Sequence, residues 1–257
     1  MFLLVHGFAA SWRWWLRILP AMSGRHRVIA VDLPGFGDSE TIAALSTATV
    51  ADRLDGLCAE LGLGAVTVVG HSLGTVIACE LAVRCPERVR ALVLVGGPIR
   101  SVLELFHHPV RTLRRHPQVA SFLLEAAAGP LPLPAPVRRA VAASRTARRL
   151  AMAPYLADPG ALPPDLAEHL MRGAGAPAAL PTLLAGLREN PTTHHRDIDR
   201  PTLVIGGADD MIVPVADLTE HARSNRVDEL LLLDGTGHSP MIERPLEVVR
   251  AVRRFLG

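Results

Sequence analysis

Short apolar runs of strand length alternate along the chain with longer segments whose apolar residues recur at helical spacing. The strand-like runs cover residues 3–5, 27–31, 65–69, 91–95, 202–206 and 229–233. The helical patterns in the same regions cover residues 50–61, 73–84, 216–223 and 245–256. Continuous apolar strands between amphipathic helices are typical of parallel sheets that are covered on both faces. The pattern therefore predicts an α/β fold with a doubly wound, mostly parallel sheet.

This alternation stops between residues 97 and 198. The stretch contains 14 of the 21 prolines, several short helical patterns and no clear strand. We therefore predict one α/β core domain, formed by residues 1–96 and 199–257 and interrupted by a helical insertion at residues 97–198.

Composition and charge narrow the class of protein. Hydrophobic residues make up 49% of the 257 residues, which excludes disorder as the main state. The net charge of +2 is far from the basic excess of nucleic-acid-binding domains, so we expect no nucleic-acid partner. All 27 basic residues are Arg, which excludes mechanisms that need a Lys. The insertion has 12 Arg against 7 acidic residues (+5), and the core has 15 against 18 (−3).

The cysteines and the apolar runs indicate the cellular location that we expect for the protein. Cys58, Cys79 and Cys85 show neither CxxC nor Cys/His ligand spacing, so neither a disulfide framework nor a metal site is expected. The first five residues lack the basic region and the length of a secretory signal, and no apolar run reaches the length of a membrane span. We expect a cytoplasmic protein without a membrane partner.

The first candidate for chemistry is the segment Gly70-His71-Ser72-Leu73-Gly74, between a predicted strand and a predicted helix. Glycines two residues before and after a serine allow a sharp turn that exposes the hydroxyl above the C-terminal edge of the sheet. Ser72 is therefore the candidate nucleophile. The backbone N–H of Leu73, at the start of the helix, is a candidate donor to an oxyanion. The alternative interpretation is a glycine-rich turn in which the serine has no catalytic role.

A serine hydroxyl needs a base that removes its proton and an acid that orients this base. Asp209 and Asp210 follow the strand-like run 202–206, and His238 follows the run 229–233. Open α/β sheets place their sites at these carboxyl ends of parallel strands. The chain order serine, acid, histidine is the order expected of such a triad. The two neighbouring acids compete for one role.

With these motifs in place, the chain resembles the α/β-hydrolase fold superfamily, in the lid-bearing group of small bacterial esterases and related hydrolases. The motifs that carry the resemblance are His6-Gly7-Phe8, Asp32-Leu33-Pro34-Gly35-Phe36-Gly37-Asp38-Ser39, the Ser72 motif, Gly207-x-x-Asp210-x-x-x-Pro214, and Gly237-His238 with Glu243 and Pro245. The resemblance implies that residues 97–198 form a helical cap over Ser72. It selects Asp210, four residues before Pro214, over Asp209. It also implies that the backbone N–H of Phe8 is the second oxyanion donor.

Pocket residues are less well defined, because the insertion completes the pocket. The candidates are Trp12, His71 and Met211, which lie close in sequence to the predicted oxyanion loop, nucleophile and acid. The cluster of Trp12, Trp14 and Trp15 also fits a helix packed against the sheet, and His71 also fits a side chain that points away from the substrate.

We predict a serine hydrolase that cleaves a carboxylic ester of a small, mostly apolar substrate through an acyl-enzyme on Ser72, without a cofactor or a metal. A thioesterase, a lactonase, a carbon–carbon bond hydrolase or an acyltransferase would use the same triad. The alternative from another class is a non-catalytic small-molecule-binding protein of this fold. Epoxide hydrolases and haloalkane dehalogenases of the fold need a carboxylate at the nucleophile position, so Ser72 argues against both.

The first predicted strand begins at Met1 or Phe2, whereas relatives usually carry a β-hairpin before it. Either the sheet is shorter at one edge, or the true start lies upstream. An exposed strand edge invites pairing with a second chain. A homodimer is therefore a candidate assembly.

Overall fold

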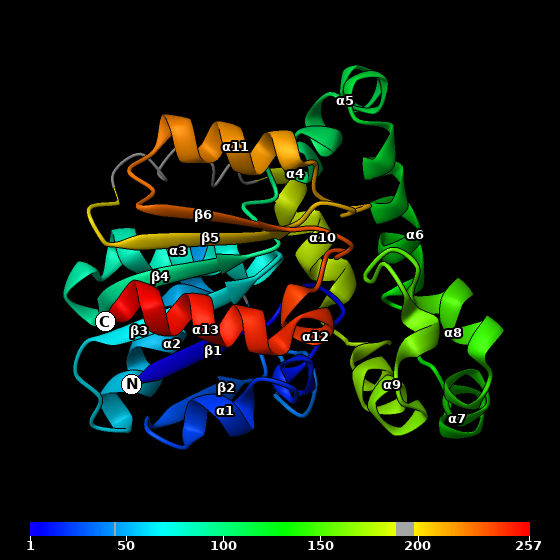
Figure 1. Cartoon of the computed structure of the whole chain (residues 1–257), viewed down its shortest axis with the longest axis horizontal. Coiled ribbons are helices and arrows are strands. Elements are labelled where there is room, and N and C mark those ends of the chain that lie inside the picture. Colours follow the sequence, from blue (N-terminus) through cyan, green and yellow to red (C-terminus); the bar gives the residue numbers. More distant parts are fainter. Residues whose placement is uncertain (44, 189–197) are drawn as a thin grey trace.

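The computed structural model describes residues 1–43, 45–188 and 198–257 (Figure 1). Within these residues, six parallel strands form one sheet in the order β2-β1-β3-β4-β5-β6. The strands are β1 Phe2–Val5, β2 Val28–Val31, β3 Val66–His71, β4 Val89–Val95, β5 Thr202–Gly207 and β6 Glu229–Leu233. Each strand corresponds to one of the six apolar runs, so the predicted doubly wound α/β fold is confirmed.

Helices cover both faces of this sheet (Figure 1). One face is covered by α2 Thr47–Glu60, α3 Leu73–Arg84 and α11 Val215–Ser224, and the other by α1 Leu19–Ser23 and α13 Pro245–Leu256. Alternate strand residues point into two separate cores: Leu92 and Leu94 of β4 belong to the first core, and Val93 and Val95 to the second. Burial on both faces explains why the strands are continuous apolar runs in the sequence.

The strand order places the carboxyl ends of β1 and β3 side by side. Val5, the last residue of β1, is in register with Gly70 of β3. The chain leaves β1 towards β2 on one side and reaches β3 on the other, so this is the point where the winding reverses. Open α/β sheets bind their ligands outside the carboxyl ends at such a point.

Between β4 and β5 the chain leaves the sheet and forms helices beyond the strand ends (Figure 1). These helices are α4 Arg100–His107, α5 Pro109–Arg115, α6 Ala120–Ala128, α7 Ala135–Ala143, α8 Arg145–Met152, α9 Pro164–Leu170 and α10 Ala179–Arg188. We call residues 100–188 the helical insertion. The predicted end of the insertion at residue 198 follows residues 189–197, which lie outside the described residues.

Two further features concern the edges of the sheet and the helix lengths. β2 and β6 are the outer strands, and β1 lies inside the sheet. A homodimer through a strand edge stays a prediction. In the described part of the chain, no helix combines the length and the apolar character needed to cross a membrane.

Candidate active site

Ser72 lies in the turn between β3 and α3, with a φ of 52° and a ψ of −118°. Such a conformation costs a residue other than glycine on the order of 1–3 kcal/mol. The Ser72 N–H donates to the Val95 carbonyl oxygen of β4 at 3.0 Å. The Ser72 carbonyl oxygen accepts from the N–H of Thr75 at 2.9 Å and from its hydroxyl at 2.6 Å. The neighbouring strand and the first turn of α3 therefore hold the strained serine in place.

The two glycines of the motif permit this turn because other backbone segments pass directly against them. A Cβ atom at Gly70 would lie 2.3 Å from the carbonyl oxygen of Gly74. A Cβ atom at Gly74 would lie 2.2 Å from the carbonyl oxygen of Val5 in β1. Side chains at either position would push α3 away from the sheet, so the spacing of the motif follows from close packing.

Asp210 and His238 form a buried pair beside this turn. Nδ1 of His238 lies 2.8 Å from Oδ2 of Asp210. Asp210 follows β5, and its Oδ1 accepts from the N–H groups of Ile212 at 2.8 Å and Val213 at 2.9 Å. Its neighbour Asp209 is exposed. Of the two acids that compete in the sequence, Asp210 is thus the one that contacts the imidazole.

The environment of His238 suits a base that takes up a proton at Nε2. Burial by itself would lower the pKa of His238, but the charge of Asp210 and the hydrogen bond to it raise the pKa above its ordinary value overall. Nε2 is buried and makes no hydrogen bond to the described residues. With Nδ1 directed at Asp210, Nε2 of the neutral ring is left as the acceptor.

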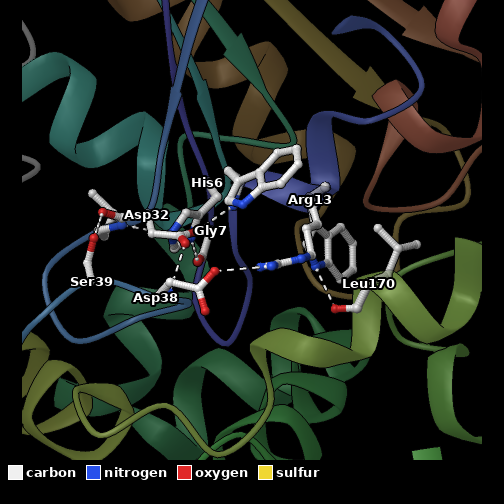
Figure 2. Close-up of polar contacts among 10 residues, drawn as sticks. His6, Gly7, Arg13, Asp32, Asp38, Ser39 and Leu170 are labelled. Atoms are coloured by element: carbon white, nitrogen blue, oxygen red, sulfur yellow. Dashed lines mark hydrogen bonds and ion pairs between the residues drawn. The ribbon is translucent and has the colours of Figure 1, made fainter.

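The loop His6-Gly7-Phe8, which follows β1, lies against the nucleophile. A Cβ atom at Gly7 would lie 2.9 Å from the Cβ atom of Ser72. Nδ1 of His6 lies 2.7 Å from the Gly7 carbonyl oxygen, and Nε2 accepts from the Leu33 N–H at 2.9 Å. Burial lowers the pKa of His6 to about 4, so the neutral ring donates through one nitrogen and accepts through the other. His6 therefore ties the loop to the segment after β2 (Figure 2).

The segment after β2 is in turn fixed by Asp32 (Figure 2). Its carboxylate accepts from the N–H of Trp12 at 2.7 Å and from that of Asp38 at 2.9 Å. Its carbonyl oxygen accepts from the hydroxyl of Ser39 at 2.8 Å. Asp38 also pairs with Arg13 at 3.1 Å. The motif that begins at Asp32 thus supports the loop beside Ser72 and supplies no reacting group.

The two predicted oxyanion donors both border Ser72. Leu73 is the first residue of α3, and the N–H groups in the first turn of a helix have no partner within that helix. Phe8 follows Gly7, and its side chain lines the same cavity as Ser72 and Leu73. The two backbone N–H groups thus belong to segments that flank the serine.

An apolar cavity adjoins the serine. Its lining comes from the loop after β1, the Ser72 turn, the loop of Asp210 and the helical insertion. The lining residues are Phe8, Ser72, Leu73, Ile99, Val102, Leu103, Phe106, Phe122, Thr182 and Ile212. Because α4, α6 and α10 contribute to this lining, the insertion takes part in the pocket.

The three candidate pocket residues lie outside the lining of this cavity. The ring of Trp12 lies 5.1 Å from the guanidinium of Arg13. His71 is buried, and its ring stacks on Trp14 at 5.9 Å. Met211 is 47% exposed. Within the described residues, no three His, Cys, Asp or Glu side chains are grouped so that they could hold a metal ion.

The structure adds two residues to this region that carry no sequence signal. These are Glu125 of α6 and Tyr155, which follows α8, and each affects the pKa of the other. Burial raises the pKa of Glu125 to about 7, against the opposing effects of His238 and Tyr155. Burial and the neighbouring Glu125 raise the pKa of Tyr155 well above its ordinary value. The insertion thus contributes a buried carboxyl group, that of Glu125, whose pKa is also affected by the charge of His238.

Glu243, which belonged to one of the sequence motifs, connects the histidine loop to the insertion. It lies in α12 Pro240–Glu243. Its carboxylate accepts from the N–H of Gly237 at 2.6 Å and from that of Ala157 at 2.7 Å. One side chain therefore holds the residue before His238 against the segment that carries Tyr155.

Comparisons with known proteins show which proteins the chain resembles. The pimeloyl-[acyl-carrier protein] methyl ester esterase of Nitrosomonas europaea is 30% identical over 275 residues, covering 96% of this chain and 91% of the relative. The dihydrolipoyllysine-residue acetyltransferase component of the acetoin cleaving system of Pseudomonas putida is 28% identical over 261 residues, covering 98% of this chain. The chain spans 62% of the length of this second relative, which is less than two thirds.

A structural comparison and a family model cover nearly the whole chain. The crystal structure of a bacterial membrane phospholipase A matches with a TM-score of 0.73 and 27% identity, covering 99% of this chain and 77% of the other. The family model described as alpha/beta hydrolase fold matches residues 1–245. The chain therefore belongs to the α/β-hydrolase fold family.

Proposed function

We propose that the chain is a serine hydrolase that cleaves a carboxylic ester of a small, mostly apolar substrate through an acyl-enzyme on Ser72. The observation that carries this proposal is the buried Asp210–His238 pair, 2.8 Å between Oδ2 and Nδ1, beside a serine in a strained turn. Membership of the α/β-hydrolase fold family and the similarity to an esterase support it.

The proposed reaction uses each of these groups in a defined step. His238 takes the hydroxyl proton of Ser72 through Nε2 while Oγ attacks the ester carbonyl carbon. The N–H groups of Phe8 and Leu73 donate to the oxyanion that forms. Asp210 holds the ring orientation and stabilises the imidazolium. His238 then protonates the leaving alcohol, and a water molecule activated by the same ring hydrolyses the acyl-enzyme.

The helical insertion is proposed to act as the cap that defines the substrate. Its helices contribute apolar side chains such as Val102, Phe106 and Phe122 to the cavity next to Ser72. Pockets with such linings recognise substrates mainly through burial of apolar surface. An apolar acyl or alcohol group of modest size fits this chemistry. A cytoplasmic location belongs to the same proposal.

An acyltransferase is the second candidate, because one relative carries that activity in its name. The two reactions share the acyl-enzyme and differ in the acceptor, which is water for a hydrolase and an alcohol, amine or thiol for a transferase. Adding a thiol acceptor to the assay separates them. A transferase gives a thioester product at the expense of free acid, whereas a hydrolase gives free acid throughout.

The test is an activity screen with nitrophenyl esters of increasing acyl length, thioesters and lactones, run on the wild type and on Ser72→Ala. We expect ester turnover by the wild type and a loss of at least about 10³-fold in kcat for Ser72→Ala. Ser23→Ala, at an exposed position at the end of α1, is the matched control and should keep full activity. A fluorophosphonate probe should phosphonylate the wild type, with loss of fluoride, and should leave Ser72→Ala unmodified.

Other outcomes are equally informative. Turnover that survives in Ser72→Ala would show that another group is the nucleophile. Tight binding of an ester or lactone by the wild type without any turnover would support the non-catalytic alternative.

A further inference from the structure

A second apolar cavity lies next to the cavity that adjoins Ser72. We call it the far cavity, and the cavity lined by Ser72 the near cavity. The far cavity has a lining that includes Phe36 after β2, Val50 of α2, Val76 and Ile77 of α3, and Ala185 of α10. With their openings to solvent included, the near cavity comprises about 430 Å³ and the far cavity about 530 Å³. Both sizes are in the range of small-molecule sites.

The two cavities share part of their lining. Leu73, Leu103 and Thr182 line both of them. Leu73 directly follows Ser72 at the start of α3, and Ile77 lies four residues further along the same helix, a rise of about 6 Å. The far cavity therefore begins beside the proposed nucleophile and extends from it along α3.

The wall of the far cavity is mostly apolar. Among the described residues that line it, none has a charged side chain. The Ser46 hydroxyl belongs to the capping box of α2, in which it accepts from the N–H of Thr49 at 3.0 Å. Empty apolar space is unfavourable in a protein, because its walls lose contacts that a close-packed interior makes. An apolar ligand that fills the space supplies those contacts.

The far cavity extends from Ser72 towards β2, away from His238. In the sheet, β3 leads to Ser72, with β1 and β2 on one side and β4, β5 and β6 on the other. Phe36 of the far cavity follows β2, whereas Asp210 follows β5 and His238 follows β6. In the proposed reaction, the leaving alcohol takes its proton from His238. The alcohol thus departs on the β6 side, and the β2 side is left for the acyl group.

We propose that the near and far cavities form one acyl channel, and that the substrate is an ester of an alkyl acyl group long enough to reach the far cavity. This inference rests on the proposed function, in which Ser72 carries the acyl group. The alkyl chain passes Leu73, Leu103 and Thr182 and ends in the far cavity. There the small side chain of Ala185 leaves room for it, which makes Ala185 a residue that determines acyl-length specificity.

The test is the dependence of kcat/KM on acyl length, measured with nitrophenyl esters from acetate to decanoate. Each methylene that enters the far cavity should raise kcat/KM of the wild type about fourfold, the equivalent of about 0.8 kcal/mol per buried CH₂. Ala185→Phe fills the far cavity from α10. Its ratio of kcat/KM for decanoate over butyrate should therefore be at least about tenfold below the wild-type ratio.

The matched control is Leu184→Phe, which adds a phenyl ring at the neighbouring, exposed position of α10 and should keep the wild-type ratio. A wild type whose kcat/KM does not rise beyond butyrate would overturn the proposal. A wild-type ratio in folded Ala185→Phe would overturn it as well. Where a thermal melt shows that Ala185→Phe is unfolded, Ala185→Leu, which adds less volume, takes its place in this comparison.

A second series, acetate esters of alcohols of increasing length, distinguishes the two halves of the ester. We expect Ala185→Phe to leave the length dependence of this series as in the wild type. A response to Ala185→Phe in the alcohol series alone would mean that the far cavity binds the leaving group, and the proposal would be wrong.

A binding measurement separates failure of the channel from failure of the proposed function. By calorimetry, Ser72→Ala should bind decanoate more tightly than butyrate, and adding Ala185→Phe should abolish the difference. If this difference is found but no ester is turned over, the proposed function fails and the channel stands. If Ser72 is required for turnover but acyl length has no effect, the channel fails and the proposed function stands.

Discussion

Replacing Asp210 by Asn tests the central contact of the site with little change of shape. In the wild type, Oδ2 of Asp210 accepts from Nδ1 of His238, and Oδ1 accepts from the N–H groups of Ile212 and Val213. An Asn side chain keeps Oδ1 on the two backbone groups and presents an NH₂ donor to Nδ1. The ring must then carry its proton on Nε2, and it loses the acceptor that Ser72 requires.

The expected loss follows from this change of tautomer and from the missing charge. In serine proteases, replacing the acid of the triad by its amide lowers kcat by about 10⁴-fold, which corresponds to about 5.4 kcal/mol of transition-state stabilisation. The two backbone hydrogen bonds of Asp210 are retained, so the variant should fold. The loss should therefore appear in kcat for every ester tested.

The assay is steady-state ester hydrolysis with Asp209→Asn as the matched control. Asp209 is the adjacent acid, and it is exposed. Its contact with the loop of His238 is made by its backbone N–H, which donates to the Thr236 carbonyl oxygen at 2.9 Å and which the substitution keeps. Asp209→Asn should stay within about twofold of the wild type, a factor that corresponds to less than 0.5 kcal/mol. A larger loss in Asp209→Asn than in Asp210→Asn would refute the assignment of the acid.

Three further predictions concern stability. Gly74→Ala places a Cβ atom 2.2 Å from the backbone of β1 and should lower the free energy of unfolding, measured in urea, by about 3 kcal/mol. The control is Gly56→Ala, within α2, where no atom lies within 4 Å of the new Cβ. This variant should raise the free energy of unfolding by about 0.5–1 kcal/mol. Glu243→Gln removes the charge that accepts from two backbone N–H groups and should lower the free energy of unfolding by about 2 kcal/mol, with faster hydrogen exchange around Ala157. The pKa of Glu125 is raised from 4.5 to about 7, so the folded state keeps a proton that the unfolded chain releases, and stability should fall as pH rises through this window. Glu125→Gln should therefore be more stable than the wild type at pH 8, by up to about 3 kcal/mol in urea melts, and should lose this advantage at pH 4.

The core domain could be predicted from the sequence because its elements are determined by local pattern. β6 at residues 229–233, α3 at residues 73–84 and α13 at residues 245–256 occur at the predicted bounds. Strands buried on both faces show as unbroken apolar runs, and the helices between them show a regular apolar stripe. The insertion lacks this regularity, because its short helices pack on one another and on the strand ends. The individual helix bounds there depend on tertiary contacts.

The candidate triad could also be predicted from the sequence, and the pocket could not. Ser72, Asp210 and His238 each follow a strand, so the sheet alone brings them to one edge. The cavity lining depends on where α4, α6 and α10 cross the sheet, which no local pattern specifies. Glu125 stands in the sequence among leucine and alanine residues as an ordinary helix-forming acid. Its burial is set by the path of the insertion.

Substitutions in the core domain and in the helical insertion should affect activity in different ways. Backbone hydrogen bonds and close packing hold Ser72, and backbone hydrogen bonds hold Asp210, in the segments that follow the strands. If these residues act with His238 as proposed, changes there should remove activity towards all substrates alike. The insertion supplies part of the apolar cavity wall, for example through Phe122 of α6. Changes at Phe122 should alter KM and the preferred acyl length, because they alter the apolar surface that the substrate buries.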